Sequence, residues 1–126
     1  MASVVHNITF GCADAYALAQ FWTVVTERPL ADDDFPGDPE ASIELESGVH
    51  LLFQQVPDPK TVKNRVHVCL RPDAPRDEEV ARLLAAGATL VDDQRRPDGT
   101  GWVVLGDPAG NEFCVERSAA EKAATA

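Results

Sequence analysis

One pattern of expected elements occurs twice in the chain, about 60 residues apart. Apolar and polar side chains alternate over residues 4–13 and again over 64–73, which predicts a half-buried strand in each place. An aspartate follows each strand, Asp14 in the first half and Asp73 in the second, and an amphipathic stretch follows each aspartate. Two copies of one pattern favour a pseudo-twofold domain over a longer array. The chain is therefore expected to fold as two related modules that mix helices and strands.

The first module is expected to contain one helix and several strands. Asp14 is a candidate N-cap, because its carboxylate can accept a backbone N–H of the first helical turn. The apolar stripe that follows consists of Leu18, Phe21, Trp22 and Val25. Two more alternating strands are predicted at residues 41–47 and 48–56, after a loop rich in proline and aspartate at 28–40.

The second module is expected to follow the same order. Its helix begins after Pro75 with three acidic residues in the first turn, where the helix dipole favours them, and Gly87 is a suitable C-terminal stop. Strands are then predicted at residues 88–93, 101–107 and 111–117.

Each module is thus expected to contain strand, helix, strand, strand, strand. We expect a single domain over residues 1–117, with module one at about 1–57 and module two at about 64–117. Residues 118–126 have no apolar face, and they are expected to form a frayed polar tail.

The composition limits the partners and the location of the protein. The 126 residues carry a formal net charge of −10, from 11 basic and 21 acidic side chains, so the basic footprint of a nucleic-acid-binding protein is missing. No apolar run approaches the roughly 20 residues of a membrane span, and we expect a cytoplasmic protein with no membrane partner. The three cysteines, Cys12, Cys69 and Cys114, are expected to be reduced thiols rather than a disulfide framework.

Two local motifs point to a known family. Asp14 is followed seven residues later by the aromatic pair Phe21 and Trp22, and residues 107–116 read DPAGNEFCVE, a closing turn and a last strand. With these motifs, residues 4 to about 117 resemble the vicinal-oxygen-chelate (VOC) superfamily, whose members include glyoxalase I, extradiol dioxygenases, fosfomycin resistance enzymes and bleomycin resistance proteins. The resemblance implies an α+β fold in which two βαβββ modules form a curled mixed sheet, a cup, with helices outside. It also implies a homodimer.

Strand alternation then divides the side chains between the two faces of that sheet. The helix-covered core is expected to contain Ile8, Phe10, Cys12, Val49, Leu51, Phe53, Val66, Val68, Leu70, Phe113 and Val115. The opposite face would line the cup, and the candidate ligand-binding residues are His50, Leu52, Gln54, His67, Cys69, Arg71, Trp102, Glu112 and Cys114. That set is polar and convergent, as the wall of a binding site is. Trp102 can stack on an aromatic ligand, although packing in the core or in a dimer is an equal alternative.

The resemblance also implies where a metal would bind. The four metal positions of the family fall on Asn7, Leu52, His67 and Cys114. Only His67 is a usual ligand there, and Leu52 cannot ligate at all, so we expect no metal cofactor. The alternative is a divalent metal at a replacement site formed by His50, His67, Cys114 and Glu112, because zinc accepts nitrogen, sulfur and oxygen donors.

Three readings of the function remain open. The leading one is a protein that resembles the bleomycin resistance branch and binds a small organic ligand, cationic or aromatic, without the family metal. The second is a lyase or isomerase that uses His67 as a general acid or base, since its unperturbed pKa is about 6.5. The third is a domain that modulates a partner protein. Glyoxalase I and dioxygenase activities are not expected, because the family's metal ligands and general base are missing.

Overall fold

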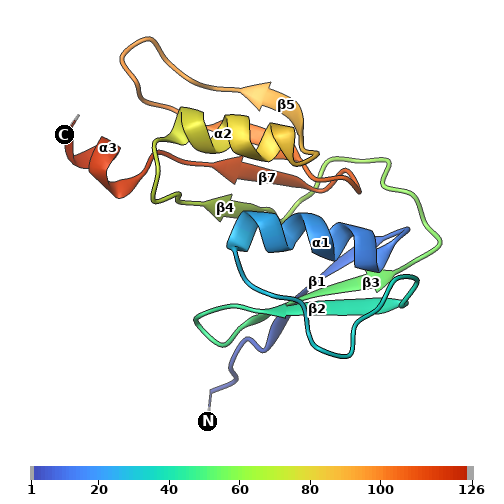
Figure 1. Cartoon of the computed structure of the whole chain (residues 1–126). Helices are drawn as coiled ribbons and strands as arrows, with labels where there is room; N and C mark the ends of the chain where they lie inside the picture. The colour runs from blue at the N-terminus through green and yellow to red at the C-terminus, as the bar shows by residue number, and fades with distance from the viewer. Residues whose placement is uncertain (1, 125–126) are drawn as a thin grey trace. The chain divides into compact units, whose positions relative to one another are not determined.

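The structure is a computed structural model that describes residues 2–124. The chain divides into two compact units, unit 1 at Met1–Thr61 and unit 2 at Val62–Ala126, each with its own sheet. Both units contain helices as well as strands (Figure 1), which confirms the α+β class. The curling of the strands into one cup stays a prediction.

Unit 1 is a three-stranded sheet with one helix. It contains β1 (Asn7–Cys12), α1 (Ala15–Thr26), β2 (Glu40–Glu44) and β3 (His50–Gln55). The strand order is β1-β3-β2, with β1 parallel to β3 and β2 antiparallel to it. A parallel pair needs a long crossover, and here α1 and β2 lie between β1 and β3 in the chain.

The predicted N-cap and apolar stripe build α1. The Asp14 carboxylate accepts the backbone N–H of Ala17 at 3.1 Å, as the sequence predicts. All four residues of the stripe are buried. The aromatic rings of Phe10 and Trp22 pack edge to face with centroids 5.3 Å apart, so α1 is held on the sheet by aromatic as well as aliphatic contacts.

The first module lacks one of its predicted strands. In the loop after α1, only an isolated bridge from Leu30 to Ile43 extends the sheet. Beside it, the Asp34 carboxylate accepts the backbone N–H of Ser42 at 2.9 Å. The Asp34 side chain therefore takes the place of a neighbouring strand as the acceptor of this β2 N–H. Prolines at 29, 36 and 39 cannot donate to a ladder, which explains why this segment stays a loop.

Unit 2 contains all four strands predicted for the second module. Its elements are β4 (Val68–Leu70), α2 (Arg76–Ala85), β5 (Thr89–Asp93), β6 (Val103–Gly106), β7 (Glu112–Val115) and α3 (Ala119–Ala124). The strand order is β4-β7-β6-β5, and only the β4–β7 pair is parallel. The core face of this sheet carries Val103, Leu105, Phe113 and Val115, which are buried together with Val80 and Leu83 of α2.

Two residues of the predicted core are exposed. Val66 is 82% exposed, because β4 begins only at Val68 and the predicted alternation does not extend to residue 66. Ile8 is 39% exposed on β1, the edge strand of its sheet, since α1 packs mainly against β2 and β3.

The prediction of a frayed tail is wrong for residues 119–124, which form α3. Ser118 and Glu121 make a capping box: the Ser118 hydroxyl accepts the N–H of Glu121 at 3.1 Å, and the Glu121 carboxylate accepts the N–H of Ser118 at 2.9 Å. The same carboxylate oxygen accepts the N–H of Arg76 at 2.7 Å. Pro75, which precedes α2, makes no side-chain cap, so Glu121 supplies the cap that α2 would otherwise lack.

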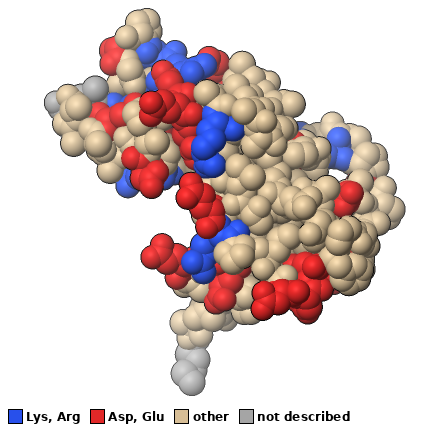
Figure 2. All heavy atoms as spheres, viewed as in Figure 1, with Lys and Arg blue, Asp and Glu red and all other residues tan. Residues whose placement is uncertain are grey.

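The surface reflects the acidic composition. Acidic side chains are spread over the face seen in Figure 2, with basic ones among them, rather than gathered in a single patch. Within residues 2–124, no helix is long and apolar enough to cross a membrane.

Candidate functional site

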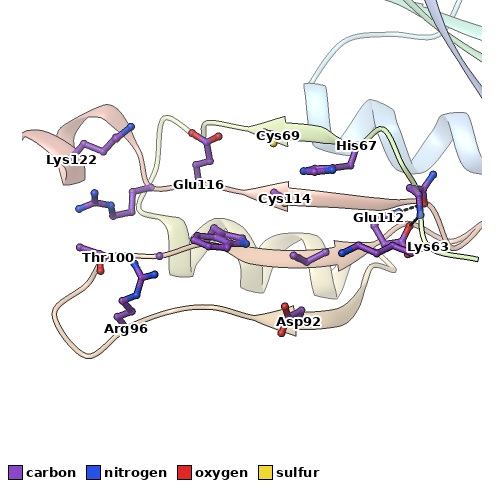
Figure 3. A pocket seen from close by; sticks show the side chains of 15 residues that line it. Lys63, His67, Cys69, Asp92, Arg96, Thr100, Glu112, Cys114, Glu116 and Lys122 are labelled. Atoms are coloured by element: carbon purple, nitrogen blue, oxygen red, sulfur yellow. Dashed lines mark hydrogen bonds between the residues drawn. The ribbon is translucent and has the colours of Figure 1, made fainter.

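Unit 2 holds a cavity of about 770 Å³ on the face of its sheet opposite the buried core. Its wall is formed by the segment before β4, by β4, β6 and β7, and by the loop between β5 and β6. Figure 3 shows these side chains in front of the strands, with α2 behind them. Five of the nine predicted ligand-binding residues line it: His67, Cys69, Trp102, Glu112 and Cys114.

Strand alternation explains this gathering. Phe113 and Val115 of β7 are buried on the α2 side, so Cys114 and the flanking Glu112 and Glu116 take the cavity side. In the same way, Cys69 lies between two residues of β4 that turn to the other face. Within unit 2, the polar face inferred from the sequence is therefore the wall of a cavity.

The other four predicted residues do not line this cavity. His50, Leu52 and Gln54 belong to β3 of unit 1, where the His50 ring stacks on His6 with centroids 5.3 Å apart. A single surface that joins them to His67 stays a prediction. Arg71 lies beyond the end of β4, because the following Pro72 disfavours extension of the ladder.

Glu112 is held in place by a neighbouring backbone. Its carboxylate accepts the N–H of Asn64 at 3.0 Å, and the Asn64 side-chain oxygen accepts the N–H of Glu112 at 3.0 Å. This reciprocal pair fixes the segment before β4 against β7. Glu112 therefore has a structural part in shaping the cavity, which its position in the sequence does not reveal.

Arg76 supports the opposite wall and was not predicted from the sequence. It is only 4% exposed, and its guanidinium donates to the carbonyl oxygens of Gly99, Thr100 and Gly101 at 3.1–3.3 Å. Gly101 has φ +95°, and a Cβ there would collide with the Gln94 carbonyl oxygen. No local signal marks Arg76 as buried, because the three carbonyl oxygens that it bonds lie more than 20 residues further along the chain.

Trp102 and charged side chains set the character of the cavity. Trp102 is 40% exposed, and the Arg96 guanidinium lies 5.8 Å from the centre of its ring, within cation–π range. The charged lining residues are Lys63, Arg96, Arg117 and Lys122 on the basic side and Asp92, Glu112 and Glu116 on the acidic side. The cavity is thus not acidic, although the chain as a whole is.

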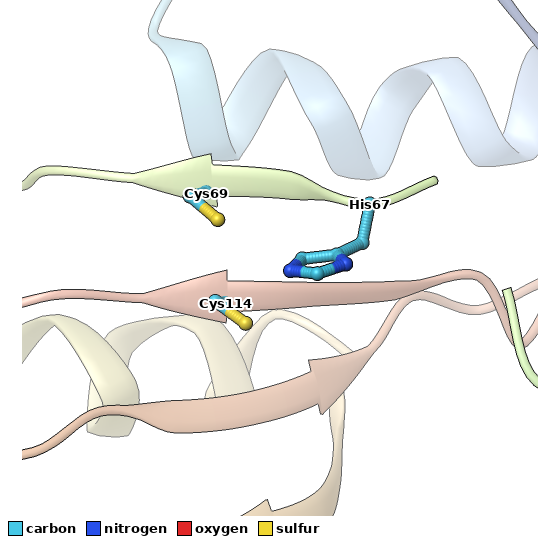
Figure 4. A group of neighbouring side chains, drawn as sticks. All are labelled: His67, Cys69 and Cys114. Atoms are coloured by element: carbon cyan, nitrogen blue, oxygen red, sulfur yellow. The ribbon is translucent and has the colours of Figure 1, made fainter. Parts of the chain in front are cut away.

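Three potential metal donors meet on the cavity wall. The ligand atoms of His67, Cys69 and Cys114 all lie within 4.8 Å of one another, on the same side of β4 and β7 (Figure 4). Cys69 and Cys114 are register partners in the parallel β4–β7 pair. Burial raises the pKa of the Cys114 thiol to about 11, and the neighbouring Cys69 adds to the shift.

The four-ligand metal set of the family does not fit these residues. Of the four corresponding positions, His67 and Cys114 meet in unit 2. Leu52 has no donor atom, and the Asn7 amide is engaged by its neighbours His6 and Thr9. Of the predicted replacement site, His67 and Cys114 meet within unit 2, and Cys69 joins them there. A site that also includes His50 of unit 1 and Glu112 stays a prediction.

Comparison with known proteins agrees with the fold and the motifs. A family described as "Glyoxalase-like domain" matches residues 7–116, which is most of the chain. Among curated protein sequences, none matches the chain.

Several solved structures share the fold. A glyoxalase-related enzyme from Fulvimarina pelagi is 20% identical, with a TM-score of 0.68 over 91% of this chain and 88% of that one. A glyoxalase/bleomycin resistance protein/dioxygenase family enzyme from Burkholderia phytofirmans is 16% identical, with a TM-score of 0.69 over 90% and 97%. A mutant of the fosfomycin resistance protein FosX from Listeria monocytogenes, in complex with Mn(II) and a dihydroxypropylphosphonic acid, is 16% identical, with a TM-score of 0.69 over 97% and 94%.

Proposed function

Because this chain belongs to the glyoxalase-like domain family of the VOC superfamily, we propose that it binds a small aromatic molecule in the cavity of unit 2, without the metal set of the family. The observation that carries the proposal is the cavity itself. Its volume of about 770 Å³ lies within the range of small-molecule sites. Its wall joins an indole to several polar groups, as such sites do.

The indole of Trp102 is the main recognition element. A partly exposed ring that lines a cavity offers a flat apolar surface to a planar ligand, and stacking on it adds to the free energy gained by burial. Arg96 lies against the same ring and can contribute a charge-assisted contact to a substituent of the ligand.

The charges of the lining favour a neutral or anionic ligand over a cationic one. Four basic side chains and three acidic ones line the cavity. An anionic or neutral ligand therefore replaces the cationic one expected from the sequence, because charges that line a site act on the ligand more strongly than distant surface charges, which salt screens.

A fluorescence titration with 8-anilino-1-naphthalenesulfonate, an aromatic anion, tests the proposal. We expect saturable binding of one dye molecule per chain with quenching of Trp102, and weaker binding of the cationic aromatic dye thioflavin T. The variant Trp102→Ala should lower the affinity about tenfold or more, as truncation of a central aromatic anchor does.

Phe35→Ala provides the matched control, because Phe35 is an aromatic residue of unit 1 that is 55% exposed and is not among the residues that line the cavity. That variant should bind the dye as the natural protein does. Equal losses in the two variants, or no loss in Trp102→Ala, would refute binding in this cavity.

A further inference from the structure

His67, Cys69 and Cys114 form a compact donor set that small-molecule binding does not explain. The two cysteines face each other because β4 and β7 pair in parallel with Cys69 opposite Cys114. His67 lies just before β4, and Figure 4 shows its side chain on the same side as the two thiols. All three donor atoms therefore converge within 4.8 Å on the cavity wall.

We propose that His67, Cys69 and Cys114 bind a zinc ion, with the fourth coordination position open to the cavity. Three protein ligands and one open position are the usual arrangement of a reactive zinc site. Zinc–sulfur and zinc–nitrogen bonds of about 2.3 and 2.0 Å place tetrahedral donors roughly 3.4–3.8 Å apart. The donors need to approach by about 1 Å, which side-chain rotation of the exposed His67 and Cys69 can provide.

The donor types decide which metal binds. Two thiols and an imidazole are soft ligands that suit zinc, whereas manganese and magnesium prefer carboxylates and water. Binding replaces the two thiol protons: one zinc ion enters, two zinc–sulfur bonds and one zinc–nitrogen bond form, and two protons leave to the solvent. Charged side chains of both signs line the cavity around the site. Among them, Glu116 and Lys63 act electrostatically on the Cys114 thiol.

This site shares His67 and Cys114 with the four family metal positions but differs from that set in its composition. Cys69 lies outside the four family positions, and all three donors come from unit 2. The proposal is also independent of aromatic-ligand binding, since it depends on the cysteine pair rather than on Trp102.

The experiment titrates the full, reduced and metal-free protein with Zn²⁺ alone, and in parallel with Co²⁺ as a spectroscopic probe. We expect one ion per chain, release of about two protons per zinc ion, and thiolate-to-cobalt charge-transfer absorption. Mn²⁺ should bind at least about a hundredfold more weakly than Zn²⁺.

Cys69→Ser is the decisive variant, because Cys69 is exposed and its replacement leaves the core intact. It should weaken zinc binding at least about tenfold and abolish the charge-transfer absorption. His67→Ala should weaken zinc binding similarly while the protein stays folded. Cys114 is buried, so Cys114→Ser is a test of zinc binding only if circular dichroism shows that the variant is folded.

Cys12→Ser and His6→Ala are the matched controls, since they remove a thiol and an imidazole from unit 1. Both should bind zinc as the natural protein does. Unchanged zinc binding in Cys69→Ser, a loss of equal size in the controls, or a preference for Mn²⁺ would overturn the proposal. Binding of 8-anilino-1-naphthalenesulfonate to metal-free Cys69→Ser reports separately on the proposed function, so failure of one leaves the other standing.

Discussion

Arg76 carries a charge into the interior of unit 2, where it is 4% exposed. Its guanidinium bonds the carbonyl oxygens of residues 99–101 and, at 3.1 Å, the Asp77 carboxylate. A buried charge is tolerated only when it is paired and hydrogen-bonded, and Arg76 meets both conditions. The loop that it holds contributes Thr100 and Gly101 to the cavity, so a single side chain links helix α2 to the candidate site.

Arg76→Met should therefore destabilise the protein by about 1–3 kcal/mol, because the loop carbonyls lose their donor while the volume is kept. Dye affinity should fall as well, since the cavity wall loses its support. Denaturant unfolding measures the first effect and the fluorescence titration measures the second.

Arg82→Met is the control on the same helix. Arg82 pairs with Glu79 at 2.7 Å but is 37% exposed, and such helix pairs contribute only about 0.3–0.5 kcal/mol. Equal destabilisation by the two variants would show that burial of Arg76 has no special effect.

At the scale of elements, α3 and α2 depend on each other through one carboxylate. Glu121 accepts the N–H of Ser118 within its own capping box and the N–H of Arg76 at the start of α2. These bonds, the one from Ser118 first, lower the pKa of Glu121 below its usual value of 4.5. The C-terminal helix is thus part of the fold of unit 2.

Glu121→Gln should lower the stability of the protein by about 1 kcal/mol at neutral pH, the usual effect of losing a cap. The pKa is lower in the folded state, so the stabilisation by Glu121 is fully present above pH 4.5 and is lost as the pH falls through the folded-state pKa. The stability difference between the natural protein and the variant should therefore vanish on acidification.

Denaturant midpoints from pH 7 down to pH 3 measure this difference. Glu46→Gln removes the same charge at an exposed position in unit 1, outside the capping box, and serves as the control. A constant gap between the natural protein and Glu121→Gln across the whole range would contradict the capping role.

At the scale of the whole molecule, two units of similar element order follow one another in the chain. In the sheet of unit 2, β5 is an edge strand, and its residues Leu90 and Val91 are 53% and 52% exposed. Unpaired edge strands with apolar side chains favour association with another chain. The homodimer that the family resemblance implies stays a prediction, and we propose the β5 edge as its interface.

We therefore expect a solution mass of about twice the 13.6 kDa of the chain, measured by light scattering after size-exclusion chromatography. Val91→Lys should shift the mass toward the single chain if the β5 edge lies in the interface. A mass of 13.6 kDa for the natural protein at every concentration would contradict dimer formation.

Much of the fold follows from local sequence patterns. The Asp14 cap, the helical stripe after it and the alternation around Phe113 can be read directly, because caps and side-chain periodicity depend on a few neighbouring residues. The capping box of Ser118 and Glu121 carried an equally local signal, a serine followed three residues later by a glutamate. The absence of an apolar face led instead to the prediction of a frayed tail.

The sequence by itself determined which residues share a face of a strand, such as Cys114 and Glu112 of β7, because successive side chains of any strand point to opposite sides. Only the tertiary structure decided that Cys69 lies opposite Cys114, that Glu121 caps α2 and that Arg76 is buried. These contacts join residues 23 to 45 positions apart, and they depend on strand register and helix packing, which no local pattern encodes.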